Sequence, residues 1–415
     1  MSTLRHVARR LPGIRGAART LDRTRAERDR LRRQRDELAE ALRRERNRLV
    51  QLERQRDALD RRRDATQRSF AVTTFEKRQR RLISTARKQS TIYGDAVAGE
   101  LWSRGFLPDK SRLYAIDRYG PDAYVTDLQR EMAGLINEPY VAILSNKAVF
   151  NELFDGVVPT VPILGYTNGL GFSGVLPENG SLFAKPVNSG GGTGVFRATV
   201  ENGRFIIDDR LLSSTEFIND LLSRRHNYIV SREVESHPEM RQFFDRTTNT
   251  LRVMMMRCPA TREGFIAGAV LRVGTVASGD MDNFTRGGIS LSVDLGTGRV
   301  GSGWQLRQLL DADGERDRVG GLTSHPDTGA RLSGRRVPLW DEVIGSCRTA
   351  FEHRPRLQYV GWDIIVTPSG PVFLEGNHYP EPRVLQVHKP LLSDDRIRTF
   401  YDHHGILDWQ PTETL

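Results

Sequence analysis

Cysteine is nearly absent from the sequence, which contains only Cys258 and Cys347 in 415 residues. The two lie far apart and outside any Cys-x-x-Cys pattern, so the sequence predicts neither a disulfide framework nor a zinc site. It also lacks the roughly 18 consecutive apolar residues that a membrane-spanning helix requires, and its N-terminus has no apolar signal-peptide core. These absences predict a soluble protein of the cytoplasm, and an apolar content of 38% suffices for a substantial core.

Lysine is scarce as well. Six lysines stand beside 56 arginines among the 62 basic residues. Because the chain uses arginine wherever a generic positive charge is enough, each lysine is a candidate for a specific role.

The net charge of +10 is confined to an N-terminal arm, residues 1–70, which holds 22 Arg and 11 acidic residues. Residues 71–415 hold 40 basic and 41 acidic residues and are almost neutral. The first 20 residues contain five arginines and no acid, which favours peripheral contact with an anionic membrane surface such as the inner membrane. Since no aromatic residues interleave with the arginines, specific nucleic-acid recognition is not expected.

Leucines recur at heptad spacing within the arm, which has no Gly or Pro between residues 21 and 64. This pattern predicts a long helix and a short, imperfect coiled coil, through which the chain would form a homo-oligomer or bind a protein partner. A solvated single helix is the alternative. The leucines are Leu31, Leu38, Leu42, Leu49, Leu52 and Leu59.

Beyond the arm we expect a mixed helical lead-in region (71–140), to which no chemistry is assigned, a catalytic domain (141–395) and a C-terminal tail (396–415). Strand-like and helical segments alternate in the catalytic domain, and several strands pair as hairpins, which predicts an α+β fold. The expected strands are 182–186, 228–234, 251–257, 265–273, 359–366 and 372–375.

The strongest local pattern is an apolar strand that ends in Lys185 and is followed by a glycine-rich turn. Glycine lets backbone N–H groups approach phosphate oxygens closely, and the lysine ammonium supplies a point charge for the same phosphates. The pattern therefore predicts a nucleotide clamp, although it matches neither the Walker motif nor the dinucleotide fingerprint, and a structural hairpin turn is the alternative. The turn residues are Gly190, Gly191, Gly192, Thr193 and Gly194.

Two acidic residues flank a Pro-Ser-Gly turn near the C-terminus. If the turn is centred on Ser369, Asp363 and Glu375 lie opposite one another with their Cβ atoms about 5 Å apart. Asn377 shares their face. Like charges paired in this way are expected only where a cation compensates them, and oxygen ligands of this kind suit Mg²⁺ on nucleotide phosphates. Acids that point to solvent are the alternative.

Arg252 and Arg272 lie on strands that are otherwise apolar, and a charge in such a place needs a partner. Binding of phosphate or carboxylate is one interpretation and an internal ion pair is the other. The polar segment 280–288 is interpreted as a substrate loop or, equally, as a surface turn.

Together these motifs resemble the ATP-grasp superfamily, and most closely its sugar-transfer-associated group, over about residues 144–390. The resemblance implies a nucleotide bound between two α+β lobes. It implies that Lys147 and Lys185 contact the phosphates, and that Asp363, Glu375 and Asn377 hold magnesium.

The strand at 228–234 resembles the family's adenine-reading linker. The resemblance implies nucleotide contacts from Arg232, Glu233 and Val234. Ser231 stands where many members have an acid, which leaves the usual side-chain contact with adenine in question. His237 is assigned no role.

The reaction implied by the resemblance begins with attack of a carboxylate on the γ-phosphate of ATP, which yields an acylphosphate and ADP. An amine or another nucleophile then captures the acylphosphate. Lys185, Arg252 and Arg272 are the expected catalytic residues, and the family's name suggests a role in cell-surface polysaccharide or glycoconjugate assembly. The alternatives are a kinase that phosphorylates a small molecule or sugar, and a non-catalytic coiled-coil scaffold.

Overall fold

A computed structural model describes residues 12–311 and 320–415 of the chain. The chain divides into two compact units, residues 1–73 and residues 74–415. The predicted membrane contact of the first 20 residues lies outside the described side chains. None of the described helices combines the length and the apolar run that crossing a membrane requires.

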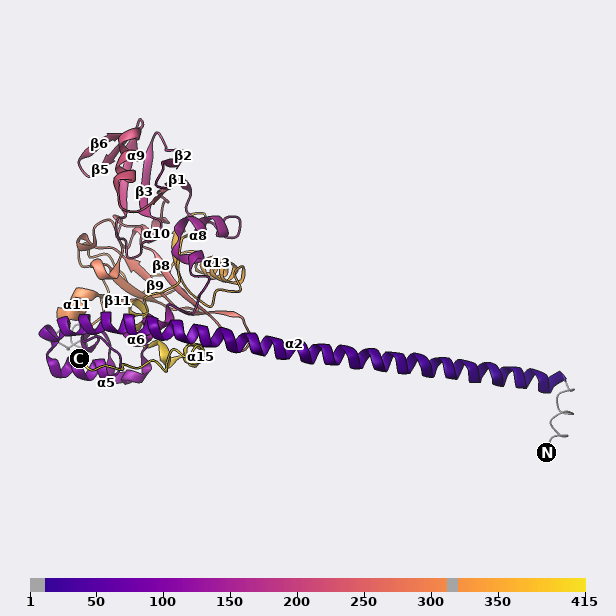
Figure 1. The fold of residues 1–415 in the computed structure, drawn as a ribbon. Helices are drawn as coiled ribbons and strands as arrows, with labels where there is room; N and C mark the ends of the chain where they lie inside the picture. The colour runs from indigo at the N-terminus through magenta and orange to yellow at the C-terminus, as the bar shows by residue number, and fades with distance from the viewer. Residues whose placement is uncertain (1–11, 312–319) are drawn as a thin grey trace. The chain divides into compact units, whose positions relative to one another are not determined.

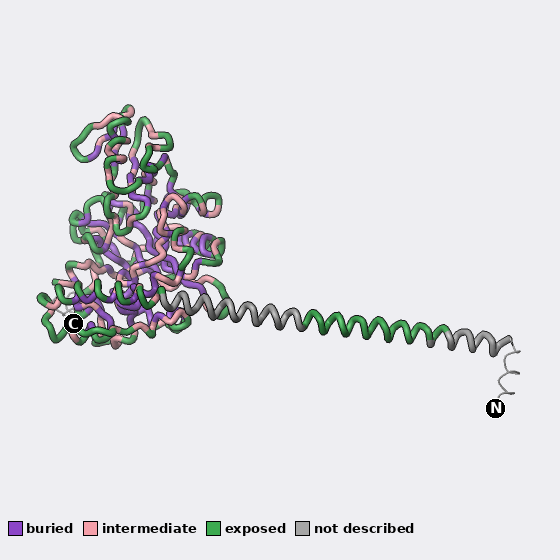
Figure 2. Tube along the Cα trace, viewed as in Figure 1, coloured by how far each residue is buried: buried purple, intermediate pink, exposed green. Residues whose placement is uncertain are grey.

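A single helix, α2 (Pro12–Tyr93), spans 82 residues, begins at a proline and runs through the predicted boundary at residue 70 (Figure 1). The described side chains between residues 23 and 46 are exposed, as the green part of Figure 2 shows. Leu31, Leu38 and Leu42 are 59%, 64% and 70% exposed, so the apolar seam has no partner among the described residues. The coiled coil therefore stays a prediction.

Short helices form the region after α2. The C-terminal segment packs against these helices and against the last part of α2. The ring of Phe75 lies 4.6 Å from that of Trp409, and Trp102 Nε1 donates to the Glu413 carbonyl at 2.8 Å. Helix α15 (Asp395–His403) buries Ile397 and Phe400. Residues 396–415, named a tail above, are thus part of the packed body. The short helices are α3 (Asp95–Ser103), α4 (Lys110–Leu113), α5 (Ile116–Tyr119), η2 (Pro121–Ala123), α6 (Asp127–Ala133) and α7 (Ala142–Ser145).

The small lobe is a seven-stranded antiparallel sheet with the order β2-β1-β7-β3-β4-β5-β6. One face packs on helix α9 (Ser214–Ser223), because alternate residues of β3 and β4 point into that core. The strands are β1 (Ile163–Thr167), β2 (Phe172–Gly174), β3 (Gly180–Pro186), β4 (Phe196–Glu201), β5 (Arg204–Ile207), β6 (Arg210–Ser213) and β7 (Tyr228–Arg232).

The large lobe is a six-stranded antiparallel sheet with the order β11-β10-β9-β8-β12-β13. Two mixed layers of antiparallel sheet and helix confirm the α+β fold class predicted from the strand pattern. The strands are β8 (Leu251–Arg257), β9 (Gly264–Val273), β10 (Ile289–Val293), β11 (Val300–Gln305), β12 (Tyr359–Thr367) and β13 (Gly370–Asn377).

The two faces of the large sheet have different roles. Val253 and Met255 of β8 point into the main core with helices α8 (Lys147–Phe154) and α13 (Trp340–Glu352). Met254 and Met256 point the other way, where α14 (Arg383–Gln386) and α15 contact the sheet. Every residue of β8 is buried, which explains why residues 253–256 are apolar on both faces of the strand. The charged Arg252 lies on this second face and lines the cavity of the site.

Candidate active site

A cavity of about 530 Å³ lies within residues 74–415, a size that suits a small-molecule site. The small lobe contributes β3, the glycine-rich turn and the end of β7, and the large lobe contributes β8, β9, β12 and β13. Of the residues predicted for the site, the cavity is lined by Lys147, Lys185, Gly190, Gly191, Gly192, Arg232, Val234, Arg252, Arg272, Asp363, Glu375 and Asn377.

Lys185 faces the cavity because β3 alternates. Leu182 and Ala184 point into the small-lobe core, whereas Phe183 and Lys185 point away from it. Lys185 Nζ lies 5.6 Å from the Phe183 ring centre. Burial, together with the neighbouring charge of Lys147, lowers the pKa of Lys185 to about 8, although Glu375 and Asp363 oppose the shift.

The glycine-rich turn contributes only part of the predicted set. Gly191 and Gly192 have φ of 66° and 72°, and a Cβ on Gly192 would come within 2.4 Å of Met281 Sδ. The positive φ therefore favours glycine at both positions, and a side chain at position 192 would also force the flexible end of Met281 to shift. Thr193 and Gly194 do not line the cavity, and their predicted nucleotide contact stays a prediction. The Gly194 carbonyl instead accepts a hydrogen bond from the Tyr228 hydroxyl at 3.1 Å, which ties the end of the turn to β7.

Lys147 is the first residue of α8, and Asn146 caps that helix. Its Nζ donates to the Ser189 carbonyl at 2.6 Å and lies 3.2 Å from Glu375 Oε2. One lysine thus joins the glycine-rich turn of the small lobe to a predicted metal ligand of the large lobe.

The hairpin of β12 and β13 places Asp363 opposite Glu375, as predicted, but for a different reason. The turn is Pro368-Ser369, since Thr367 pairs with Gly370, and this register alone would place Asp363 opposite Leu374. A bulge between Asp363 and Ile364 restores the predicted pair. Leu374 and Glu375 consequently both line the cavity.

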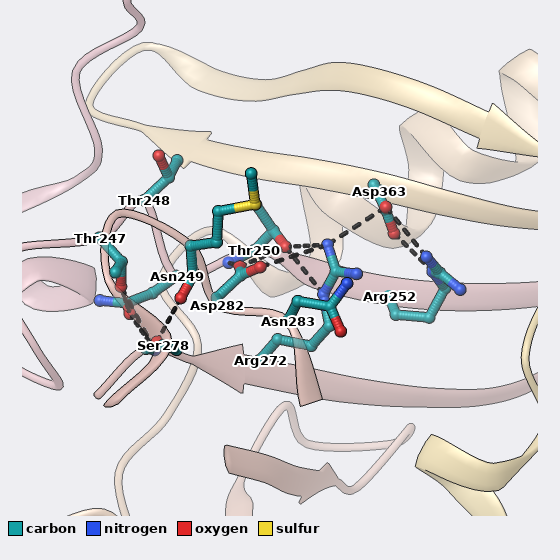
Figure 3. A network of polar contacts seen from close by, with 12 residues as sticks. Thr247, Thr248, Asn249, Thr250, Arg252, Arg272, Ser278, Asp282, Asn283 and Asp363 are labelled. Atoms are coloured by element: carbon teal, nitrogen blue, oxygen red, sulfur yellow. Dashed lines mark hydrogen bonds and ion pairs between the residues drawn. The ribbon is translucent and has the colours of Figure 1, made fainter. Parts of the chain in front are cut away.

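Two arginines surround the Asp363 carboxylate (Figure 3). Arg252 donates to it through Nε at 2.5 Å and Nη2 at 3.0 Å, and Arg272 Nη2 lies 3.1 Å away. Burial would raise the pKa of Asp363, but the charges of Arg252 and Arg272 outweigh it and lower the pKa to about 2. Arg252 and Arg272 thus compensate this acid in the structure, and its predicted role as a metal ligand stays a prediction. Both arginines thus form an internal ion pair with Asp363, and their predicted binding of phosphate or carboxylate stays a prediction.

Arg272 also extends the network toward the segment 280–288. Its Nε donates to Thr250 Oγ1 at 3.0 Å, and the backbone N and Oγ1 of Thr250 each donate to Asp282 Oδ2 at 2.6 Å (Figure 3). Residues 280–285 line the cavity. This polar segment is therefore a wall of the site, held in place through Thr250.

The predicted magnesium ligands fit the ion in part. Glu375 and Asn377 present oxygen atoms to the cavity: Asn377 donates its Nδ2 to the Gly361 carbonyl at 3.2 Å, which turns its Oδ1 away from that bond. Both oxygens of Asp363 already accept from arginines. Mg²⁺ is commonly held by one or two carboxylates together with substrate phosphates, so Glu375 and Asn377 suffice as a partial ligand set. Within residues 12–311 and 320–415, no group of three or more His, Cys, Asp or Glu side chains could hold a metal ion.

The segment expected to read adenine is divided between two hollows. Ser231 lines the main cavity, and Val234 lines both this cavity and a neighbouring pocket. Glu233 lines only the neighbouring pocket and pairs with Arg197 at 2.8 Å. Glu233 is not part of the main cavity wall, and its predicted nucleotide contact stays a prediction. His237 caps helix α10 (Pro238–Arg241) by accepting from the Glu239 backbone N at 3.2 Å, which accords with leaving it without a role.

The cavity residues that the sequence did not reveal include Arg130, Tyr379, Glu381 and Arg383. Arg130 belongs to α6, in the region without assigned chemistry, and no local pattern distinguishes it from other helical arginines. Glu381 and Arg383 follow Asn377 closely, and their charge directly after a strand of the site was an available signal.

Residues 172–394 match the family described as sugar-transfer associated ATP-grasp. No curated protein matches the sequence.

The solved structures that share likeness with the chain include three ligases or synthetases. A D-alanyl-alanine synthetase A from Vibrio cholerae has 13% identity and a TM-score of 0.35, with 72% of this chain and 75% of that chain covered. The VanG D-Ala:D-Ser ligase from Enterococcus faecalis has 12% identity and a TM-score of 0.33, with 66% of this chain and 64% of that chain covered. An N5-carboxyaminoimidazole ribonucleotide synthetase in complex with ADP has 10% identity and a TM-score of 0.31, with 58% of this chain and 46% of that chain covered. The chain thus spans less than two thirds of the length of the last two, and such likeness does not bear on what it binds.

Proposed function

Because the chain belongs to the sugar-transfer-associated ATP-grasp family, we propose that it is an ATP- and magnesium-dependent ligase. Its first step is attack of a carboxylate oxygen on the γ-phosphorus of ATP, which breaks the bond to the β-phosphate oxygen and releases ADP. An amine or another nucleophile then attacks the acylphosphate carbonyl, and inorganic phosphate leaves.

One observation carries the proposal: a single cavity brings together Lys147, Lys185 and the glycine-rich turn with the Glu375 and Asn377 oxygens. Cations and carboxylate or amide oxygens in one cavity are what a nucleotide polyphosphate with Mg²⁺ requires. In this proposal Lys147 leaves Glu375 when the nucleotide binds and turns to its phosphates.

The residues have separate roles in the proposed reaction. Lys185 and Lys147 bind the phosphates, and Glu375 and Asn377 would hold Mg²⁺, which supplies charge neutralisation when bound. Arg272 and Arg252 lie beside Asp363 and stabilise the negative charge that spreads over the transferred phosphoryl group. Phe183 and Val234 supply apolar wall for the base, and exclusion of water protects the acylphosphate.

We further propose a place in cell-surface polysaccharide or glycoconjugate assembly, at the cytoplasmic side of the membrane. The family's description supports this, together with the basic composition of the arm. The same arm would hold a second copy or a protein partner through its leucine seam.

The test is ADP release by the purified protein with Mg²⁺, ATP and pools of carboxylates, amines and sugars, followed by the product mass. An amide or ester supports the ligase. A product heavier by one phosphate would establish the kinase instead, and absence of nucleotide binding would leave only a scaffold.

Lys185→Met should abolish turnover, and Lys77→Ala is the matched control because Lys77 is exposed on α2. Lys110 is unsuitable as a control, since it is buried and pairs with Asp109 at 2.8 Å and Asp127 at 2.9 Å.

A further inference from the structure

One corner of the cavity is built by two parts of the chain that lie far apart in sequence. Arg130 comes from α6, outside the residues that match the family, and Tyr379, Glu381 and Arg383 follow β13. All four side chains line the same cavity as Lys185 and Glu375. We call these four residues the arginine corner. Nothing in the proposed phosphoryl transfer uses them.

Arg130 is held firmly in this corner. Its Nη1 donates to the Tyr379 hydroxyl at 2.7 Å, and its guanidinium lies 3.9 Å from the Tyr379 ring centre. Its Nη2 lies 3.2 Å from Glu381 Oε2. Stacking and ion pairing together fix the plane of the guanidinium, which is the pre-organisation that a planar anion requires.

Arg383 is held loosely by comparison. Its closest acid oxygens are those of Glu381 at 3.5 Å and Asp109 at 3.8 Å, and its side chain makes no hydrogen bond within the described residues. The Nε atoms of Arg383 and Arg130 are both buried and have no hydrogen-bond partner among residues 12–311 and 320–415. Buried donors of this kind are rare in folded proteins, and a missing ligand is one of the few physical reasons for them.

The net charge around the arginine corner indicates which charge its ligand carries. Arg130 and Arg383 belong to a connected network of ion pairs that holds five basic and four acidic residues, which leaves one positive charge. The basic residues are Arg78, Arg81, Lys110, Arg130 and Arg383, and the acidic residues are Asp109, Asp127, Glu131 and Glu381. Burial would raise the pKa of Glu381, but Arg130, Arg383 and Lys110 lower it to about 2, so this acid is ionised throughout the physiological range. A singly charged planar anion matches both the charge and the forked donors, which favours a carboxylate over a phosphate dianion.

We propose that the arginine corner binds a carboxylate of the substrate that is not transformed in the reaction. The reacting group must reach the terminal phosphate beside Lys185 and Glu375. The contacts of Arg130 and Arg383 are instead with Tyr379, Glu381, Glu131 and Asp109. The substrate class is therefore a molecule with a second, recognition carboxylate, such as that of an amino acid or a uronic acid. This inference rests on the proposed function for the place of the reacting group.

The test uses the full chain with Mg²⁺ and a non-hydrolysable ATP analogue, and acetate as the probe. Acetate at constant ionic strength should raise the thermal unfolding midpoint of the wild type, and phosphate should do so less. Arg383→Gln and Arg130→Gln should each weaken the apparent acetate affinity by about 10–100-fold, the usual effect of losing a hydrogen bond to a charged group.

Arg335→Gln is the matched control, because Arg335 also lies over an aromatic ring, that of Phe243 at 5.3 Å, and donates to a side chain, that of Gln242 at 2.7 Å, but lies outside the cavity. This variant should keep the wild-type acetate affinity. Glu381→Gln should tighten acetate binding by about tenfold, since it removes a like charge beside the ligand.

The Glu381→Gln variant keeps the proposal testable if the arginine variants do not fold. An acetate affinity that is unchanged in Glu381→Gln, or equal in all variants, would overturn the carboxylate assignment. So would a phosphate response that is stronger than the acetate response and depends on the same arginines. Nucleotide binding is measured in the same series: its absence in the wild type refutes the proposed ligase, whereas intact nucleotide binding without a corner-dependent acetate response refutes only this inference.

Discussion

Lys185 provides a prediction that depends on the environment of a single ammonium group. Its pKa is lowered to about 8 by burial and by Lys147, so the cavity holds a lysine that titrates close to neutral pH. Nucleotide phosphates beside it would favour the charged form and return the pKa toward its ordinary value near 10.4. Binding of the nucleotide above pH 8 should therefore take up a proton.

The size of the effect follows from the two pKa values. At pH 8.5 about a quarter of the free protein carries a charged Lys185, whereas nearly all of the bound protein does, so about 0.7 proton is taken up per nucleotide. At pH 6.5 the uptake by this group is close to zero. The apparent nucleotide affinity should fall by about fourfold at pH 8.5 and by about tenfold at pH 9, relative to pH 7.

The same shift acts on the nucleotide-free protein with the opposite consequence. The folded-state pKa lies below that of the unfolded chain, so the folded state binds fewer protons between about pH 8 and pH 10.4, and the contribution of Lys185 to stability improves as the pH rises through that window. Ligand-free stability and nucleotide affinity should therefore change in opposite directions above pH 8.

Titration calorimetry with Mg²⁺ and a non-hydrolysable ATP analogue, in buffers of different ionisation enthalpy, measures the proton uptake. The terminal phosphate adds little above pH 7.5, since the second pKa of a phosphate lies near about 6. Lys185→Met should lose the uptake, and Lys77→Ala should keep it because Lys77 is exposed. Wild-type binding without uptake at pH 8.5, or equal uptake in Lys185→Met, would refute the reasoning.

Three further predictions concern other parts of the chain. Glu375→Gln should abolish Mg²⁺-dependent turnover and, by leaving Lys147 without its partner at 3.2 Å, lower the unfolding free energy by about 1 kcal/mol, which chemical denaturation measures; unchanged turnover would exclude Glu375 from the metal site. Gly192→Ala should weaken nucleotide binding in a fluorescence titration more than Gly191→Ala, because both have positive φ but only Gly192 would meet Met281; equal effects would make the contact irrelevant. Leu38→Lys should reduce the mass measured by light scattering if the arm forms a coiled coil, and a mass of one chain in the wild type would contradict that role.

Several elements were predictable because their determinants are local. The alternation of β3, the position of Lys185 ahead of the glycines, and the two strands around Pro368-Ser369 are all written in short stretches of sequence. The α+β class follows from the same local patterns, and the confinement of net charge to the arm is a matter of composition. The nucleotide and metal roles of these residues remain predictions.

The register of the hairpin could not be derived correctly, because a bulge adds one residue to one strand without any change in the polar pattern. The expected turn centre was wrong by half a residue, and the bulge after Asp363 restored the pair with Glu375. A displaced turn and an unforeseen bulge thus cancelled.

By itself, then, the sequence determined which residue types could bind phosphate and metal, and in which order they lie, since backbone periodicity and turn chemistry act over a few residues. Only the tertiary structure decided what surrounds them. Arg252 meets Asp363 across 111 positions and Arg130 meets Tyr379 across 249, and no pattern within a strand or helix reveals such partners. Ion pairs and cavity walls depend on which elements fold against one another, which is why the arginines around Asp363 and the arginine corner became visible only in three dimensions.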